Sequence, residues 1–246
     1  MMFKDYIAVV TGASRGIGYA TAKALAAEGA HVIAIARTVG SLEDLDDDIK
    51  ANGRGEATLV PLDITDYDAL DRLGSIIAEK YGKLDILVGN AATLGDITPI
   101  SHLKPKVWQQ LIDINVSANY RLIRSLDPLL RASNNGRAVF LGSSNIVRDP
   151  RPFWGGYAVS KAALECLVKT YAKEIEISNL RVNILNPGAL RTAMRARAAP
   201  GEDANTLDTP ADLMPLLLKL CSPVFNDNGK IADYQMWKKD KNNFFF

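Results

Sequence analysis

Along this chain, short aliphatic runs alternate regularly with longer amphipathic runs. The short runs are rich in Val and Ile, which is typical of strands buried on both faces of a parallel sheet. These runs are Tyr6–Val10, His31–Ala36, Ala57–Leu62, Leu84–Val88, Arg137–Leu141 and Arg181–Leu185, with a seventh near Lys230–Gln235. The longer runs have helical periodicity, over about Ile17–Glu28, Leu42–Asn52, Asp66–Tyr81, Lys104–Leu130 and Gly156–Ile177. Helix ends are expected at Gly53, Gly82 and Asn179. This order predicts an α/β fold, with a doubly wound parallel sheet of about seven strands (a Rossmann fold).

Residues 1–246 are expected to form a single domain. Breaks rich in Pro and Gly fall at 148–156 and 198–210, but neither separates two segments large enough for a core of their own. Both are therefore interpreted as loops over an active site, and the substrate loop is expected at about 193–210. Residues 237–246 end in three phenylalanines. They fit a docking arm at a subunit interface and a frayed end equally well.

Bulk composition excludes several functional classes. The net charge is +1, which gives no support for a nucleic-acid or acidic-membrane partner. No apolar run approaches the roughly 18 residues that a membrane span needs, and no signal-peptide pattern is present, so a cytoplasmic protein is expected. Two cysteines, Cys166 and Cys221, and two histidines, His31 and His102, are too few and too scattered for a zinc site or a disulfide framework. No metal is expected.

A glycine-rich turn, Thr11–Gly18, follows the first strand and opens the first helix. Glycines at such a turn let backbone N–H groups approach a pyrophosphate, and the helix N-terminus favours its negative charge. The spacing is Gly-x3-Gly-x-Gly, and a purely structural turn is the alternative. Its place between a strand and a helix, at the first turn of an α/β pattern, favours dinucleotide binding.

The charges after the second strand favour NADP(H) over NAD(H). An NAD site usually has an acidic residue about 20 residues past the glycines, against the ribose 2′-hydroxyl. Here no acid occurs before Glu43, and the nearest charged residue is Arg37. Arg15 lies within the glycine turn itself. Two guanidinium groups would suit a 2′-phosphate; the alternative for each is a solvated surface arginine.

Tyr157 and Lys161 stand four residues apart at the start of a helical run, so they share one face. A tyrosine with its ordinary pKa of about 10 is a poor base near neutrality. A neighbouring ammonium favours the phenolate and lowers that pKa towards a useful range. The pair alone is also compatible with an ordinary helix surface.

Together these motifs resemble the short-chain dehydrogenase/reductase family. The resemblance rests on the glycine turn, the Tyr157/Lys161 pair and Ser144, which stands thirteen residues before the tyrosine. It covers about Ile7–Cys221. Further matches follow in the family's order: Asp63, Asn90-Ala91, Asn115, Asn186-Pro187-Gly188 and Thr192. The run from Ser143 through Thr192 to Thr209–Asp212 resembles a bacterial branch whose members mostly have no assigned substrate.

The resemblance implies catalytic roles for Asn115, Ser144, Tyr157 and Lys161. Tyr157 would exchange a proton with the substrate oxygen, and Lys161 would hold the nicotinamide ribose and lower the tyrosine pKa. Ser144 would hydrogen-bond the substrate oxygen, although the adjacent Ser143 competes for that role. Asn115 would hold a water that links Lys161 to solvent; a buried helix amide bonded to backbone is the alternative.

The resemblance also implies a set of cofactor-binding residues. Asp63 would contact the adenine, unless it caps the next helix, and the segment from Pro187 to Thr192 would cover the nicotinamide carboxamide. The full set is Gly12, Ser14, Arg15, Gly16, Ile17, Gly18, Arg37, Asp63, Ile64, Asn90, Ala91, Tyr157, Lys161, Pro187, Gly188, Leu190 and Thr192.

Two departures from the family pattern stand out. The usual Asn-Asn-Ala-Gly after the fourth strand reads Gly89-Asn90-Ala91-Ala92 here, which is expected to alter a local hydrogen bond and not the chemistry. The Asp-Gly-Gly that commonly follows the last strand is only partly matched by residues 229–233. A homodimer or homotetramer is expected, and this second departure puts the tetramer in more doubt.

The expected function is hydride transfer between NADPH and a small-molecule carbonyl or alcohol, most simply as a ketone or 3-oxoacyl reductase. A sugar, steroid or polyol alcohol dehydrogenase is the first alternative, and a non-catalytic NADP(H)-binding sensor or interaction protein is the second. Phe153 and Trp154 are expected either to wall the substrate site or to pack at a subunit contact. Three arginines, Arg191, Arg195 and Arg197, either attract an anionic substrate or form a solvated face.

Overall fold

In the computed structural model, which describes residues 1–52 and 54–246, seven parallel strands form one sheet in the order β3-β2-β1-β4-β5-β6-β7. The strands are β1 (Ile7–Thr11), β2 (His31–Ala36), β3 (Glu56–Pro61), β4 (Ile86–Gly89), β5 (Arg137–Leu141), β6 (Arg181–Asn186) and β7 (Ile231–Asp233). The predicted doubly wound sheet is confirmed. The strand order reverses between β1 and β4, and at such a point a crevice opens beyond the carboxyl ends of the strands.

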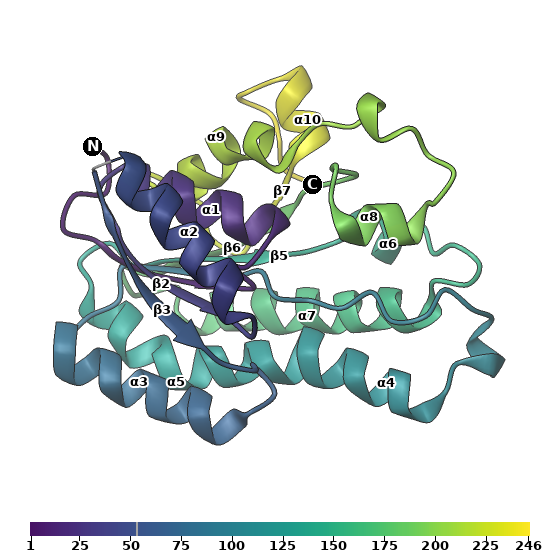
Figure 1. Ribbon diagram of the computed structural model, residues 1–246, viewed down its shortest axis with the longest axis horizontal. Helices are drawn as coiled ribbons and strands as arrows, with labels where there is room; N and C mark the ends of the chain where they lie inside the picture. Colours follow the sequence, from purple (N-terminus) through teal and green to yellow (C-terminus); the bar gives the residue numbers. More distant parts are fainter. Residues whose placement is uncertain (53) are drawn as a thin grey trace.

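Helices cover both faces of the sheet (Figure 1). Helices α1, α2 and α9 lie on one face, whereas α3, α5 and α7 lie on the other. The helices are α1 (Gly16–Ala27), α2 (Val39–Asn52), α3 (Tyr67–Tyr81), α4 (Pro105–Ile112), α5 (Ala118–Ala132), α6 (Ser144–Arg148), α7 (Gly155–Glu174), α8 (Ala193–Ala198), α9 (Pro210–Cys221) and α10 (Tyr234–Lys239). A helical layer forms on each side of the sheet because the strands are apolar on both faces.

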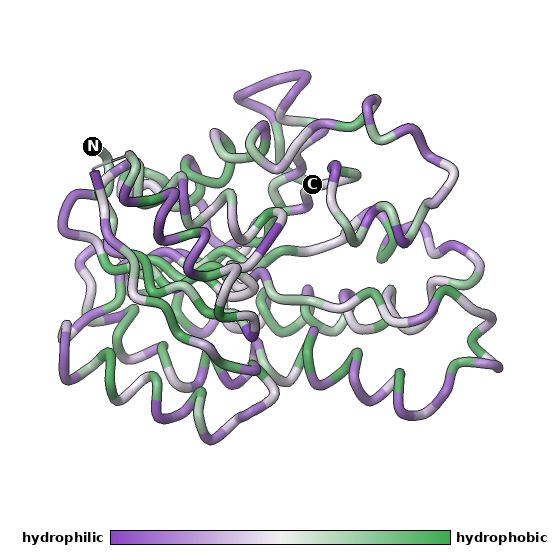
Figure 2. Tube along the Cα trace, viewed as in Figure 1, coloured by the Kyte–Doolittle hydropathy of each residue, from purple (hydrophilic) through white to green (hydrophobic). Residues whose placement is uncertain are grey.

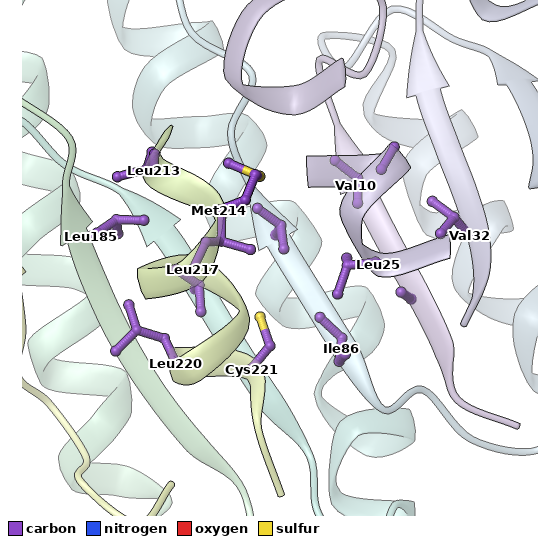
Figure 3. Packing of buried hydrophobic residues seen from close by; sticks show 14 of the residues in the cluster. Val10, Leu25, Val32, Ile86, Leu185, Leu213, Met214, Leu217, Leu220 and Cys221 are labelled. Carbon is purple, nitrogen blue, oxygen red and sulfur yellow. The ribbon is translucent and has the colours of Figure 1, made fainter. Parts of the chain in front are cut away.

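Alternate strand residues supply two hydrophobic cores. Val10 and Val32 pack towards α1 and α9, together with Leu25 and Leu217, as Figure 3 shows. Their strand neighbours, such as Val9, join the second core beneath α3, α5 and α7. In Figure 2 the sheet region is hydrophobic and the outer turns of the helices carry most of the hydrophilic residues. The aliphatic runs therefore act as the central layer that fixes the strand ends in place.

Helix boundaries differ from expectation in several places. The helix expected over Lys104–Leu130 is α4 and α5 joined by a π-helical turn, Asp113–Ser117. Gly82 ends α3 with a φ of 68°, as predicted. The expected end at Asn179 is wrong, because α7 stops at Glu174, and the Ser178 hydroxyl closes the following turn by donating to the Ile175 carbonyl (2.7 Å). The end expected at Gly53 lies outside the described residues.

The last residues of the chain pack on their own sheet. Phe244 is 2% exposed and belongs to the core, and its carbonyl accepts a hydrogen bond from the Asp233 amide (2.7 Å). Phe245 forms an antiparallel bridge with Ala232 of β7, and the Phe246 ring lies 3.9 Å from the Arg148 guanidinium of α6. The interpretation of residues 237–246 as a frayed end is wrong, and a role as a docking arm stays a prediction. The tail covers the edge of β7 and contacts the segment that precedes the Tyr157 helix.

None of the helices in the described part of the chain combines the length and the apolar character that a bilayer crossing requires.

Candidate active site

A cleft of about 970 Å³ opens beyond the carboxyl ends of the strands, where the strand order reverses. Its floor is the glycine turn between β1 and α1, and one side is formed by the segments that follow β2 and β3. The segment after β4, helix α4, the start of α7 and helix α8 complete the other sides. The fold thus brings nearly all the motifs singled out in the sequence into one cavity.

The glycine turn has a backbone that tolerates no side chain at two positions. Gly12 has a φ of 66°, and a Cβ there would lie 2.9 Å from the Asn90 side-chain nitrogen. Gly18 does not line the cleft; it packs behind the turn, where a Cβ would lie 2.2 Å from the Gly12 carbonyl oxygen. The turn and the start of α1 therefore present bare backbone to the cleft, as a phosphate cradle requires.

Asn90 holds this turn from the neighbouring strand. Its side-chain amide donates to the carbonyls of Thr11 (2.9 Å) and Gly12 (3.3 Å), and its backbone N–H donates to the Thr11 hydroxyl (3.0 Å). Packing explains the glycine at position 89, because a Cβ there would lie 2.4 Å from the Phe140 ring of β5. The Asn-to-Gly departure from the family pattern therefore accompanies an aromatic residue on the adjacent strand.

Arg15, Arg37 and Asp63 line the end of the cleft beside β2 and β3. Arg37 and Asp63 form an ion pair at 3.6 Å, with the Arg37 side chain mostly exposed and the Asp63 side chain partly buried. Burial works to raise the pKa of Asp63, but hydrogen bonds from Thr65 and the Arg37 charge outweigh it and hold that pKa below its ordinary value. Asp63 does not cap α3, because Asp66 accepts the capping bond from the Ala69 amide (3.0 Å).

Tyr157 and Lys161 lie one turn apart on α7, and both line the cleft. The Lys161 nitrogen lies 5.9 Å from the centre of the tyrosine ring and donates to the Leu141 carbonyl (2.8 Å). Burial raises the pKa of Tyr157 to about 12 and lowers the pKa of Lys161 to about 8. The tyrosine pKa thus moves in the direction opposite to the expected one, because desolvation of the phenolate outweighs the hydrogen bond from Ser143.

The structure separates the two neighbouring serines. Ser143 lines the cleft and hydrogen-bonds to Tyr157, which works to lower the tyrosine pKa. Ser144 is fully buried, and its hydroxyl donates to Glu165 (3.1 Å) on the side of α7 that faces away from the cleft lining. The turn after β5 directs Ser143 into the cleft, whereas the Ser144 hydroxyl joins α6 to α7. The geometry therefore favours Ser143 for the substrate contact expected of Ser144.

Asn115 lies in the π-helical turn between α4 and α5 and is fully buried. Its side-chain oxygen accepts from the Thr93 amide (2.8 Å), and its nitrogen donates to the Thr93 carbonyl and to the Ser160 hydroxyl (both 2.9 Å). Asn119 donates to its backbone carbonyl (2.9 Å). This geometry matches the buried-amide alternative, and the water relay stays a prediction.

The other predicted cofactor-binding positions all line the cleft together with Tyr157 and Lys161. They are Gly12, Ser14, Arg15, Gly16, Ile17, Arg37, Asp63, Ile64, Asn90, Ala91, Pro187, Gly188, Leu190 and Thr192.

An apolar wall lies on the substrate side of the cleft, and of its members only Trp154 was among the residues expected there from the sequence. Leu94, Val107, Ile114 and Trp154 line the cleft there, and the Trp154 ring meets the Tyr157 ring edge-on, with centroids 6.1 Å apart. Of the two aromatic residues weighed for this wall, Trp154 faces the cleft, whereas Phe153 is 54% exposed outside its lining. Val107 and Ile114 occupy positions that fit the ordinary core face of a long helix. Helical periodicity alone therefore does not mark them as residues of a substrate site.

Comparison with known proteins decides the family. The short chain dehydrogenase family model matches residues 6–203. The chain belongs to the short-chain dehydrogenases. It is 41% identical to the Escherichia coli K12 oxidoreductase YciK over 221 residues, which cover 89% of this chain and 87% of that protein. It is also 32% identical to the 3-oxoacyl-[acyl-carrier-protein] reductase FabG of E. coli K12 over 207 residues, covering 84% and 82% of the two chains.

A solved structure gives the same result in three dimensions. A putative short chain dehydrogenase from E. coli CFT073, in complex with NADPH, superposes with a TM-score of 0.89 at 40% identity, covering 95% of this chain and 98% of the other. The protein is thus an oxidoreductase of this family by sequence and by fold. Among the described residues, no three His, Cys, Asp or Glu side chains gather to hold a metal ion.

Proposed function

We propose that this short-chain dehydrogenase is an NADPH-dependent carbonyl reductase with Tyr157 as its proton donor. The observation that carries the proposal is the arrangement of Tyr157, Ser143 and Lys161 in the same cleft as the glycine turn. A proton donor, a positioning hydroxyl and a dinucleotide cradle are the parts that carbonyl reduction needs from the protein.

The residues of the cleft fit NADPH. The bare backbone of the turn at Gly12 and Gly16 suits the pyrophosphate, and Arg15 and Arg37 are positioned at the cleft end beside β2 for the 2′-phosphate. When bound, NADPH supplies the hydride that reduces the carbonyl carbon. The NADPH complex of the E. coli CFT073 relative supports this choice. A preference for NADPH over NADH follows from the two arginines, since a 2′-phosphate forms charge-assisted bonds with guanidinium groups.

Three side chains handle the oxygen and the proton. The Ser143 hydroxyl donates a hydrogen bond to the carbonyl oxygen and holds it beside the Tyr157 hydroxyl. Tyr157 transfers its proton to that oxygen as the alcohol forms, which leaves a phenolate. The Lys161 ammonium, 5.9 Å from the centre of the tyrosine ring, stabilises this phenolate and returns a proton to the tyrosine.

Ketones and 3-oxoacyl groups are the favoured substrates within this proposal, and the likeness to FabG supports the second class. An alcohol dehydrogenase running in oxidation is less well supported, because a Tyr157 pKa of about 12 leaves little phenolate to accept a proton near neutrality. A non-catalytic sensor would not need Tyr157, Ser143 and Lys161 together at one cavity.

A fluorescence titration of the purified protein with NADPH and NADH tests the cofactor, and NADPH consumption with a panel of ketones and 3-oxoacyl thioesters tests the reaction. Tight NADPH binding with turnover of at least one carbonyl is expected. Tight binding without any turnover would favour the sensor, and weak binding of both nucleotides would overturn the proposal.

Arg37→Asp is expected to weaken NADPH binding by about 100-fold, because a charge-assisted bond to phosphate is worth about 1.5–3 kcal/mol and is replaced here by repulsion. NADH affinity should change little, since it has no 2′-phosphate. Paired titrations of both nucleotides measure the difference, with Arg72→Asp on the exposed face of α3 as the charge-matched control. Equal losses for the two nucleotides would contradict the phosphate assignment.

The rate of reduction is expected to be level at low pH and to fall as the pH rises through about 8. Burial sets the pKa of Lys161 at about 8 and that of Tyr157 at about 12, so both groups carry their protons below pH 8 and Lys161 loses its proton first. Initial rates at saturating NADPH give the profile. In Lys161→Arg the decline should move to higher pH, because guanidinium stays protonated. A wild-type rate that stays level well above pH 8 would contradict this assignment.

A further inference from the structure

Three arginines of the segment after β6 line the cleft, and two of them are already engaged. Arg191 donates to the carbonyls of Ala204 (2.9 Å) and Leu207 (3.5 Å), so it holds the loop that leads to α9. Arg195 forms a two-pronged ion pair with Glu202, with both distances 2.6 Å. That pair raises the pKa of Arg195 and lowers the pKa of Glu202. Arg191 and Arg195 therefore stabilise the loop between α8 and α9.

Arg197 lies in the same cleft with its charge uncompensated. Its side chain is exposed, and its Nη2 group donates to the Gly95 carbonyl at 3.4 Å, which is a long bond to a neutral acceptor. Across the residues that the structure describes, no carboxylate forms an ion pair with it. Asp96 lines the cleft beside Gly95 but is not within ion-pair distance of Arg197.

The contact with Gly95 shows where the Arg197 guanidinium lies. Gly95 belongs to the segment after β4, so the side chain reaches from α8 to the opposite side of the cleft. That side also carries the apolar wall of Val107, Ile114 and Trp154. Among the basic side chains that line the cavity, Arg15, Arg37 and Lys161 are assigned to NADPH, and Arg191 and Arg195 hold the loop, which leaves Arg197 for a negatively charged part of the substrate.

We propose that Arg197 binds a carboxylate of the substrate, which makes the substrate a keto acid with a short aliphatic chain. The inference rests on the proposed reductase function. A carboxylate offers Arg197 two charge-assisted bonds in place of one long bond to a backbone carbonyl. The apolar wall takes the aliphatic part, and the keto group lies at the Tyr157 end of the cleft. Arg197 is then a specificity-determining residue and takes no part in proton transfer.

The test compares acids with their uncharged esters. Acetoacetate, levulinate and oxoheptanoate, each beside its methyl ester, are assayed for NADPH consumption and for binding to the NADPH-loaded enzyme. At least one acid is expected to exceed its ester by about tenfold or more in kcat/KM, the gain typical of a charge-assisted hydrogen bond. Arg197→Met should remove this preference by raising KM for the acid more than for the ester, so that the acid-to-ester ratio of kcat/KM falls to about one. Arg197→Lys should keep part of it.

Arg72→Met on α3 removes the same charge far from the cleft and should leave the preference intact. Absence of any acid preference in all three pairs, in turnover and in binding, would overturn the inference, as would a preference that survives Arg197→Met. The proposed function fails separately: Arg197-dependent binding of an acid without turnover of any acid or ester would support the anion site and contradict the reductase.

Discussion

Tyr157→Phe is expected to lower kcat for carbonyl reduction by about 10³-fold, within the range that a positioned proton donor contributes. The substitution removes the hydroxyl that donates a proton to the substrate oxygen in the proposed mechanism. The ring remains, so the edge-on contact with Trp154 and the packing of α7 are kept. NADPH affinity should therefore stay close to that of the wild type. Single-turnover rates and a nucleotide titration on the same preparation measure the two quantities.

A matched control is available on α5. Tyr120 is 49% exposed, and Tyr120→Phe removes the same atom from the surface without effect on the reaction. Two results would count against Tyr157 as the acid. Full activity in Tyr157→Phe would mean that another group protonates the substrate. A loss of activity that is matched by an equal loss of NADPH binding would mean that the hydroxyl holds the cofactor or the fold.

The fold was predictable because its signals are local and agree with one another. Most of the strands are short aliphatic runs, and every residue of β1 and of β5 is buried. Helix ends were less predictable, because the competing signals are tertiary. The π-helical turn at Asp113–Ser117 is held by the bonds between Asn115 and Thr93, which lie 22 residues apart in sequence. Nothing in the helical periodicity of Lys104–Leu130 indicates that interruption.

The site was predictable where a motif fixes the backbone itself. The glycine turn and the Tyr157/Lys161 pair are set by local geometry, and the structure brings them to one cleft. Properties that depend on surroundings were not predictable in this way. The direction of the Tyr157 pKa shift depends on burial, and which of the three arginines keeps only one long hydrogen bond depends on where Glu202 and the Ala204 carbonyl fall.

The choice between Ser143 and Ser144 shows the same limit at one position. A spacing of thirteen residues to Tyr157 selects Ser144, but residues 149–154 between α6 and α7 form a loop, and loops tolerate an added residue. The turn after β5 decides instead. This turn places Ser143 in the cleft, where it hydrogen-bonds to Tyr157, and it directs Ser144 towards Glu165 on α7.

Alanine substitutions at Ser143 and Ser144 are expected to have opposite effects on activity and on stability. Ser143→Ala should lower kcat by about 100-fold, as loss of a hydrogen bond to the reacting oxygen does, with little change in the free energy of unfolding. Ser144→Ala should leave kcat within a few-fold of wild type and lower the free energy of unfolding by about 1 kcal/mol, because a buried bond to Glu165 is lost. Glu165 keeps its ion pair with Lys169 (2.7 Å), which limits that cost. Steady-state kinetics and urea unfolding give kcat and the free energy of unfolding for each of the two variants. If Ser144→Ala loses activity while Ser143→Ala keeps it, the thirteen-residue spacing is the better guide and the hydroxyl that faces the cleft is not the one that holds the substrate.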